Sequence, residues 1–222
     1  MTWRIPGTVL EADRREADQI PQQLEALFFG GGITLSQVTA ITGLEAHTVQ
    51  NWVKRRFVTS PVAKRYSLRQ LCRIININML KSVLTLDQIC QLLGYVNGTL
   101  GDERDDMIDD SRLYFMFVRL AARMQEFSEP AATDALLEQY LQDYEEPVPG
   151  AKDRVRKVLR VMLTAWLAAR MTQRTQEMLN NLYEKGKALR TTITNGCRTT
   201  RRSPPKRPST GSGCAILSLL CC

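Results

Sequence analysis

Polar side chains that could read DNA bases recur on one face of a helix predicted over residues 45–55. At the helical spacing i, i+3, i+4, i+7 stand His47, Gln50, Asn51 and Lys54. The opposite face is apolar and carries Val49, Trp52 and Val53, as expected for a helix packed on a core. Side-chain amides bond base edges through paired hydrogen bonds, which suits this face to a DNA major groove. The alternative is a set of exposed helix residues without a ligand.

Further candidates for DNA contact flank this face. They are Thr48, Arg55, Lys64, Arg65 and Tyr66. The alternative for Thr48 is a local cap, for Arg55 and its neighbour Arg56 a solvated helix end, and for Tyr66 a ring in the core. Residues 44–73 hold seven Lys and Arg against one acid, which is the charge balance that phosphate contacts require.

The elements that must position these residues can be predicted from local patterns. A helix beginning at Thr34 and Leu35 ends at Gly43, and the helix over 45–55 follows at once. Next, two short strands, residues 57–58 and 64–66, flank a turn at residues 59–61, which predicts a small β-wing. Ser67 with Gln70 and Thr85 with Gln88 form capping-box patterns that open two further helices. These patterns together predict the order helix, turn, recognition helix, wing and helix.

This succession resembles the DNA-binding domain of MerR-type regulators over residues 33–95. The matching positions are Leu35, Val38, Gly43-Leu44, Thr48-Val49, Pro61, Arg65-Tyr66-Ser67, Leu71, Leu84-Thr85-Leu86, Ile89 and Leu92-Leu93. More closely, the run from Gly31 to Leu80 resembles an uncharacterised bacterial family filed as a domain of unknown function, number 1836, which implies no established ligand. The resemblance to MerR-type regulators implies a winged helix-turn-helix, with the recognition helix in the major groove and the wing on the phosphate backbone.

The chain departs from the MerR pattern on its reading face. Gln50, Asn51 and Trp52 stand where that pattern has an arginine and two tyrosines. Trp52 can replace an aromatic core residue, whereas the two amides lack the charged fork of arginine. The resemblance therefore implies the docking mode and leaves the sequence preference open.

The fold class expected for the chain is mostly α, with a MerR-like winged helix-turn-helix followed by a C-terminal helical bundle and long helix. Expected divisions are an N-terminal helical arm (1–32, with a helix over 19–29), the DNA-binding domain (33–98), an acidic linker and helical block (99–150), a long helix (151–194) and a disordered basic, cysteine-containing tail (195–222). Residues 101–110 lack the register of a calcium loop, so we interpret them as a solvated acidic run leading to a cap at Ser111. A second block helix is expected over 134–144. The apolar stripe over 155–183 and the MerR resemblance together predict a homodimer.

The sequence also indicates what classes of function to set aside. One histidine, no nucleotide-binding loop and no nominated catalytic set argue against an enzyme, a metal site or a cofactor. No apolar run approaches the length of a membrane span, and the N-terminus lacks a signal peptide, so we expect a cytoplasmic, nucleoid-associated protein. We expect double-stranded DNA as the partner of a transcriptional regulator, with no membrane partner and with any effector unidentified. The alternatives are an architectural, excisionase-like helper and a protein-interaction module whose winged helix does not bind DNA.

Overall fold

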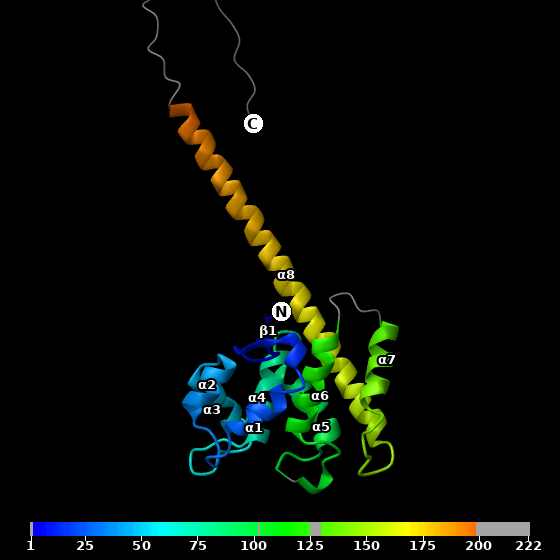
Figure 1. Ribbon diagram of the computed structural model, residues 1–222. Coiled ribbons are helices and arrows are strands. Elements are labelled where there is room, and N and C mark those ends of the chain that lie inside the picture. The colour runs from blue at the N-terminus through cyan, green and yellow to red at the C-terminus, as the bar shows by residue number, and fades with distance from the viewer. Residues whose placement is uncertain (1, 102, 125–129, 199–222) are drawn as a thin grey trace, which may run out of the picture. The chain divides into compact units, whose positions relative to one another are not determined.

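The computed structural model describes residues 2–101, 103–124 and 130–198, and it is mostly helical. The chain divides into two compact units, residues 1–174 and 175–222. The elements are β1 (Thr2–Arg4), β2 (Glu11–Asp13), the 3-10 turn η1 (Arg14–Glu16), α1 (Ile20–Ala26), α2 (Leu35–Thr42), α3 (Ala46–Lys54), α4 (Leu68–Leu80), α5 (Leu86–Asn97), η2 (Glu103–Asp105), α6 (Asp110–Arg123), α7 (Pro130–Tyr140) and α8 (Ala151–Arg198). Figure 1 labels β1 and the helices α1 to α8.

The core of the first unit is built on α4 and α6, which pack directly against each other. α4 buries the apolar residues Leu71, Cys72, Ile74, Ile75, Ile77 and Leu80. α6 buries Leu113, Tyr114, Phe115, Phe117, Val118 and Leu120. α2 and α3 lie on one side of this pair, and α7 with the beginning of α8 lies on the other (Figure 1). Helices α2 and α3 are thus supported by α4, which in turn packs on the distant helix α6.

Within the described residues, three helices begin with the reciprocal hydrogen bonds of a capping box, in which a hydroxyl and a glutamine each satisfy a free backbone N–H. The boxes predicted at Ser67 and Thr85 are confirmed, with Gln70 and Gln88 as partners. Thr34 and Gln37 form a third box at the beginning of α2. The predicted cap at Ser111 is wrong, because the carboxylate of Asp109 accepts from the backbone N–H groups of residues 111 and 112 and helix α6 begins at Asp110.

The N-terminal segment contains an antiparallel strand pair that the sequence patterns did not predict. Thr2 pairs with Asp13 and Arg4 with Glu11. The loop between the strands packs on the core, where the Tyr114 hydroxyl donates to the Pro6 carbonyl at 2.9 Å. The helix predicted over 19–29 is shorter, Ile20–Ala26. These residues therefore contribute to the core of the first unit.

The long C-terminal helix begins at Ala151 as predicted. Its first four turns are buried in the first unit through Ala151, Val155, Val158, Leu159, Met162, Leu163 and Trp166. The Trp166 ring meets the Phe117 ring of α6 edge-on, with centroids 5.9 Å apart. The apolar stripe predicted over 155–183 therefore has two parts. Its first part is buried in the core of its own chain, and only its second part is exposed. The second block helix is also displaced, to Pro130–Tyr140.

In the second unit, the helical residues from Thr175 to Tyr183 are exposed. Four of them are large and apolar: Met178, Leu179, Leu182 and Tyr183. Helix α8 continues to Arg198. The disordered tail expected from residue 195 lies outside the described residues from 199 onwards. No helix in the described part of the chain is both long and apolar enough to cross a membrane.

Candidate nucleic-acid interface

The turn between α2 and α3 follows from Gly43 and its neighbours. Gly43 ends α2 in the left-handed conformation, with φ of 69°, which costs glycine little because it has no Cβ. The Thr42 hydroxyl donates to the Val38 carbonyl and accepts from the backbone N–H of Leu44. The chain is thereby fixed on both sides of the turn, and α3 begins two residues later.

One face of α3 anchors it to the core. Val49 is fully buried and Trp52 is 5% exposed. The Lys81 ammonium lies 5.8 Å from the centre of the Trp52 ring, and burial lowers the pKa of Lys81. These contacts fix the rotation of α3 about its axis and so determine which side chains face outwards.

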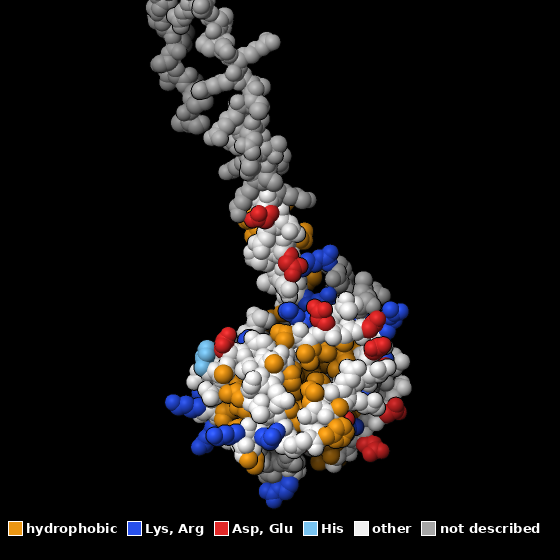
Figure 2. All heavy atoms as spheres, turned by 60° about the vertical axis from the view of Figure 1, so that its left-hand side comes forward, with side chains coloured by type: hydrophobic (Ala, Val, Ile, Leu, Met, Phe, Trp, Pro, Cys, Tyr) orange, Lys and Arg blue, Asp and Glu red, His pale blue; other side chains and the backbone are white. Residues whose placement is uncertain are grey.

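The outward face carries the residues that the helical spacing predicted. His47, Gln50, Asn51 and Lys54 are all exposed, and Thr48 is half-buried. None of the four exposed side chains hydrogen-bonds to another described residue, so their donors and acceptors are available to a ligand. Lys and Arg side chains gather beside a histidine on this side of the molecule (Figure 2). The structure therefore brings these side chains together on an accessible surface.

The end of α3 is fixed by a Schellman motif. The Phe57 N–H donates to the Trp52 carbonyl at 2.9 Å, and the Arg56 N–H donates to the Val53 carbonyl at 3.0 Å. Arg56 itself has φ of 60°, a conformation usually occupied by glycine in this motif. The Arg55 guanidinium stacks on the Phe57 ring at 4.6 Å. Arg55 and Arg56 are both exposed, so the end of the candidate reading helix is positively charged.

The segment predicted to form a wing contains a tight hairpin whose turn lies at a different position from the predicted one. The tight turn is Val62–Arg65, closed by a hydrogen bond of 2.9 Å from the Arg65 N–H to the Val62 carbonyl. Ala63 and Lys64 have φ of 48° and 61°, the positive pair of a type I′ hairpin. Pairing in this segment is limited to isolated bridges between Val62 and Arg65 and between residues 33 and 66.

The prediction of a turn at residues 59–61 is wrong, because a side chain of α4 holds this segment in place. The side-chain amide of Gln70 donates to the carbonyls of Thr59 and Ser60 at 2.9 and 3.0 Å. The reversal of the chain is thereby displaced to Ala63 and Lys64. Lys64 stands exposed at the tip of the hairpin.

The last two candidates have different environments. Arg65 is exposed, and its Nη1 donates to the Gly32 carbonyl at 2.9 Å, which ties the wing to the loop before α2. Tyr66 is only 4% exposed and its backbone pairs with Ile33. Burial also raises the pKa of its hydroxyl. The prediction that the Tyr66 ring faces DNA is therefore wrong. The ring is part of the hydrophobic core, as the alternative interpretation held. Arg56 was not among the predicted contact residues, but it is exposed beside them and belongs to the candidate interface.

The acidic run 101–110 is partly buried, so the expectation of a solvated run is also wrong. Asp110 is 2% exposed and lies 3.4 Å from Arg73, and Asp106 lies 2.5 Å from Arg69. Asp105 accepts from the Thr99 N–H. These acids thus hold the segment before α6 against α4. Within the described residues, His, Cys, Asp and Glu form no group of three that could hold a metal ion.

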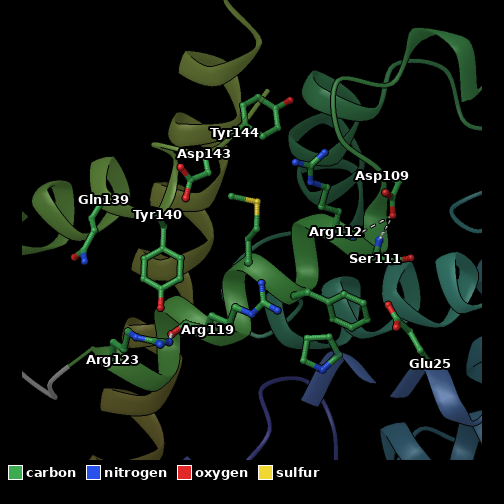
Figure 3. Close-up of a pocket in the computed structure, with 13 residues that line it drawn as sticks. Glu25, Asp109, Ser111, Arg112, Arg119, Arg123, Gln139, Tyr140, Asp143 and Tyr144 are labelled. Carbon is green, nitrogen blue, oxygen red and sulfur yellow. Dashed lines mark hydrogen bonds between the residues drawn. The ribbon is translucent and has the colours of Figure 1, made fainter. Parts of the chain in front are cut away.

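A separate cavity of about 690 Å³ lies between α6 and α7, outside the candidate interface. Figure 3 shows Tyr140 extending towards Arg119 and Arg123, and the Arg123 guanidinium lies 5.0 Å from the centre of the Tyr140 ring. Arg119 and Arg123 also pair with Asp18. The three arginines that line this cavity, with Arg112 as the third, are matched in number by Glu25, Asp109 and Asp143. The lining therefore favours neither sign of ligand charge.

Comparison with known proteins finds that less than half of the chain, including α2 and α3, is similar to an uncharacterised domain family. Residues 20–117 match the family described as domain of unknown function DUF1836. The chain is also 29% identical over 86 residues to the uncharacterized protein YkrK of Bacillus subtilis (strain 168). That match covers 37% of this chain and 37% of YkrK. No solved structure matches the chain.

Proposed function

We propose that the protein is a sequence-specific DNA-binding transcriptional regulator of the MerR-like winged-helix type. Helix α3 enters the major groove, and the hairpin Val62–Arg65 lies against the phosphate backbone. The observation that carries the proposal is the outward face of α3. It combines two free side-chain amides, an imidazole and a cation on a helix whose rotation is fixed by Val49 and Trp52.

The charges around this face support the same docking mode. Lys54, Arg55 and Arg56 follow one another at the end of α3, and Lys64 and Arg65 lie in the hairpin. All five side chains are exposed. Neutralising phosphates releases counterions, so such a surface gives an affinity that falls steeply with salt. Gln50 and Asn51 are the residues that would read bases, with adenine as the favoured partner of each amide.

The resemblance to MerR-type regulators, together with the usual use of two recognition helices on two half-sites, supports a homodimer. The apolar residues available for pairing are those of the second unit, Met178, Leu179, Leu182 and Tyr183. Helices that associate in water bury such a stripe against a copy of itself. The protein would then bind a pseudo-palindromic operator in the cytoplasm.

The experiment that tests the function is selection of bound fragments from a random DNA library, followed by affinity measurements at several salt concentrations. We expect one enriched motif with two half-sites. Replacing Gln50 and Asn51 by alanine should weaken binding to that motif by about 5–150-fold for each bidentate pair lost. Lys54→Ala should weaken binding to all sequences and reduce the salt dependence by about one phosphate contact. Gln91→Ala, an exposed glutamine on α5, is the control and should change neither.

Two other results would replace this proposal. Binding that depends on salt but enriches no motif would favour an architectural, excisionase-like helper. A chain that binds no DNA at low salt would instead be a protein-interaction module.

A further inference from the structure

A cavity of about 650 Å³ lies directly beneath the wing. Its walls come from the hairpin segment around Val58 and Val62, from Phe28, from Leu68 in the first turn of α4, and from Leu100 before η2. Small-molecule sites in proteins have this size and this mainly apolar lining. The cavity therefore has the dimensions of a ligand site, and it adjoins the candidate interface.

The floor of the cavity is polar and deeply buried. Gln70, Arg73 and Asp110 are 9%, 5% and 2% exposed. Arg73 donates through Nε to the Phe57 carbonyl at 3.2 Å, and Gln70 donates to the carbonyls of residues 59 and 60. The floor thus holds the backbone that joins α3 to the hairpin. A ligand that contacts these side chains acts on the position of the wing.

The charges of the lining favour an anion. Arg65, Arg69 and Arg73 line the cavity, and Asp110 is the acid among the lining residues. Arg69 pairs with Asp106 and Arg73 pairs with Asp110. The exposed Arg65 uses Nη1 on the Gly32 carbonyl and keeps other N–H groups for a ligand. Burial raises the pKa of Asp110 to about 6 in spite of the two neighbouring arginines. A perturbed acid inside a cavity is typical of functional sites.

We propose that this wing cavity binds a small organic anion with an apolar body, such as a medium-chain carboxylate. The apolar part contacts Val58, Leu68 and Leu100, and the anionic group lies at the rim beside Arg65. Occupancy changes the position of the hairpin and so the affinity for DNA. The regulatory part of this inference depends on the proposed function, whereas ligand binding does not.

Two other cavities have linings that do not specify a class of ligand. The cavity between α6 and α7 has balanced charges, as described above. A smaller groove of about 350 Å³ between α1 and α2 is apolar, with Leu24, Leu27 and Ala40 among its lining residues, and nothing in the structure shows what covers it. The wing cavity differs because its charge, its apolar walls and its buried floor specify one class of ligand.

Binding can be tested on the full chain with anilinonaphthalene sulfonate, a fluorescent apolar anion, as the probe. We expect saturable fluorescence enhancement and displacement of the probe by octanoate at a concentration at least about tenfold lower than by 1-octanol, which has the same chain length without the charge. Arg65→Gln should bring the two displacing concentrations close together, because the rim charge is lost. Equal displacement by both compounds in the unmodified protein would overturn the proposal, as would the absence of probe binding.

The position of the site can be tested by filling the cavity. Leu100→Trp should weaken probe binding by about tenfold or more, and Leu27→Trp, a matched change in the groove near α1, should leave it unchanged. Val62→Trp, at an 81% exposed hairpin residue, provides a second filling variant if Leu100→Trp does not fold. Loss of binding in the Leu27 variant alone would place the probe elsewhere and overturn the assignment.

The regulatory part is tested by repeating the DNA titration at saturating octanoate. We expect a change in DNA affinity of at least about threefold, which Leu100→Trp abolishes. If the protein binds octanoate but no DNA, the proposed DNA-binding function is wrong and the ligand site still stands. DNA affinity that is unchanged by octanoate would overturn the coupling.

Discussion

Arg56 occupies the left-handed position that is usually glycine in helices ending in a Schellman motif, and this makes a test possible at the scale of one residue. A side chain with a Cβ pays about 1 kcal/mol or more for the left-handed conformation. Arg56→Gly should therefore raise the free energy of unfolding by about 1 kcal/mol, measured by urea denaturation. Arg56→Ala keeps the strained backbone and removes the same charge, so it is the control and should be close to neutral. Equal stabilities of the two variants would show that strain at this position is unimportant.

Asp110 predicts a pH dependence of stability with a definite sign. Burial raises the folded-state pKa of its carboxyl group to about 6, above the ordinary value of 3.8, so protonation favours the folded chain. The contribution is complete below pH 3.8 and is lost as the pH rises through 6, with a slope of about 1.4 kcal/mol per pH unit between these values. Denaturation of the natural protein and of Asp110→Asn should show their stability difference moving in favour of the asparagine variant from pH 4 to 6. A difference independent of pH in this range would contradict the assignment.

At the scale of elements, the N-terminal hairpin depends on a close approach between Gly7 and α4. A Cβ on Gly7 would stand 2.6 Å from the Ile75 carbonyl oxygen, and φ there is 74°. The Gly7 carbonyl also accepts from the Asn78 side chain at 2.9 Å. Gly7→Ala combines a steric clash with backbone strain, so we expect it to destabilise the protein by about 2 kcal/mol or more.

Gly150→Ala is the matched control for this change. Gly150 also has a positive φ, 82°, but a Cβ there would meet nothing within 4 Å. Its substitution should cost only the strain, about 1 kcal/mol. Thermal unfolding of both variants measures the difference, and equal losses would mean that the hairpin moves away from α4 without cost.

The elements that sequence patterns predicted correctly are those stabilised by local interactions. The capping boxes at Ser67 and Thr85 and the two faces of α3 depend on residues three or four positions apart, so the spacing is sufficient to find them. The strands β1 and β2 have three residues each and no apolar alternation. Their position depends on distant partners such as Tyr114, which no local pattern reveals.

In the candidate site too, the features that depend on local spacing were predicted and those that depend on distant residues were not. The exposure of Gln50 and Asn51 followed from helical spacing alone. The hairpin turn at Ala63 and Lys64 lacks the Asn-Gly or Gly residues that normally mark a type I′ turn, so the sequence pointed to Pro61 instead. The pairing of Arg73 with Asp110 joins residues 37 positions apart and was invisible in the sequence. The wing cavity depends on that pair and could not have been predicted.

At the scale of the whole molecule, self-association is the property that the second unit predicts. Met178 and Leu182 are 61% and 68% exposed on neighbouring turns of one helix. Their joint replacement by glutamate should convert a dimer into a monomer in sedimentation experiments at micromolar concentration, because charges cannot be buried in an apolar seam. Asn180→Glu adds charge on the side of the helix opposite Met178 and Leu182 and should leave the dimer intact. A natural protein that sediments as a monomer would exclude this mode of assembly.

The N-terminal hairpin also bears on how the protein can be divided for recombinant work. The guanidinium of Arg14 donates to the carbonyls of Ala121, Ala122 and Met124 at the end of α6. A fragment limited to the family match, residues 20–117, would lose this cap and would also cut α6 beside the buried Phe117. It would expose core surface from α4 and α6 and should be recovered as aggregate. We expect a fragment of residues 1–174, which corresponds to the whole first unit, to keep this core intact.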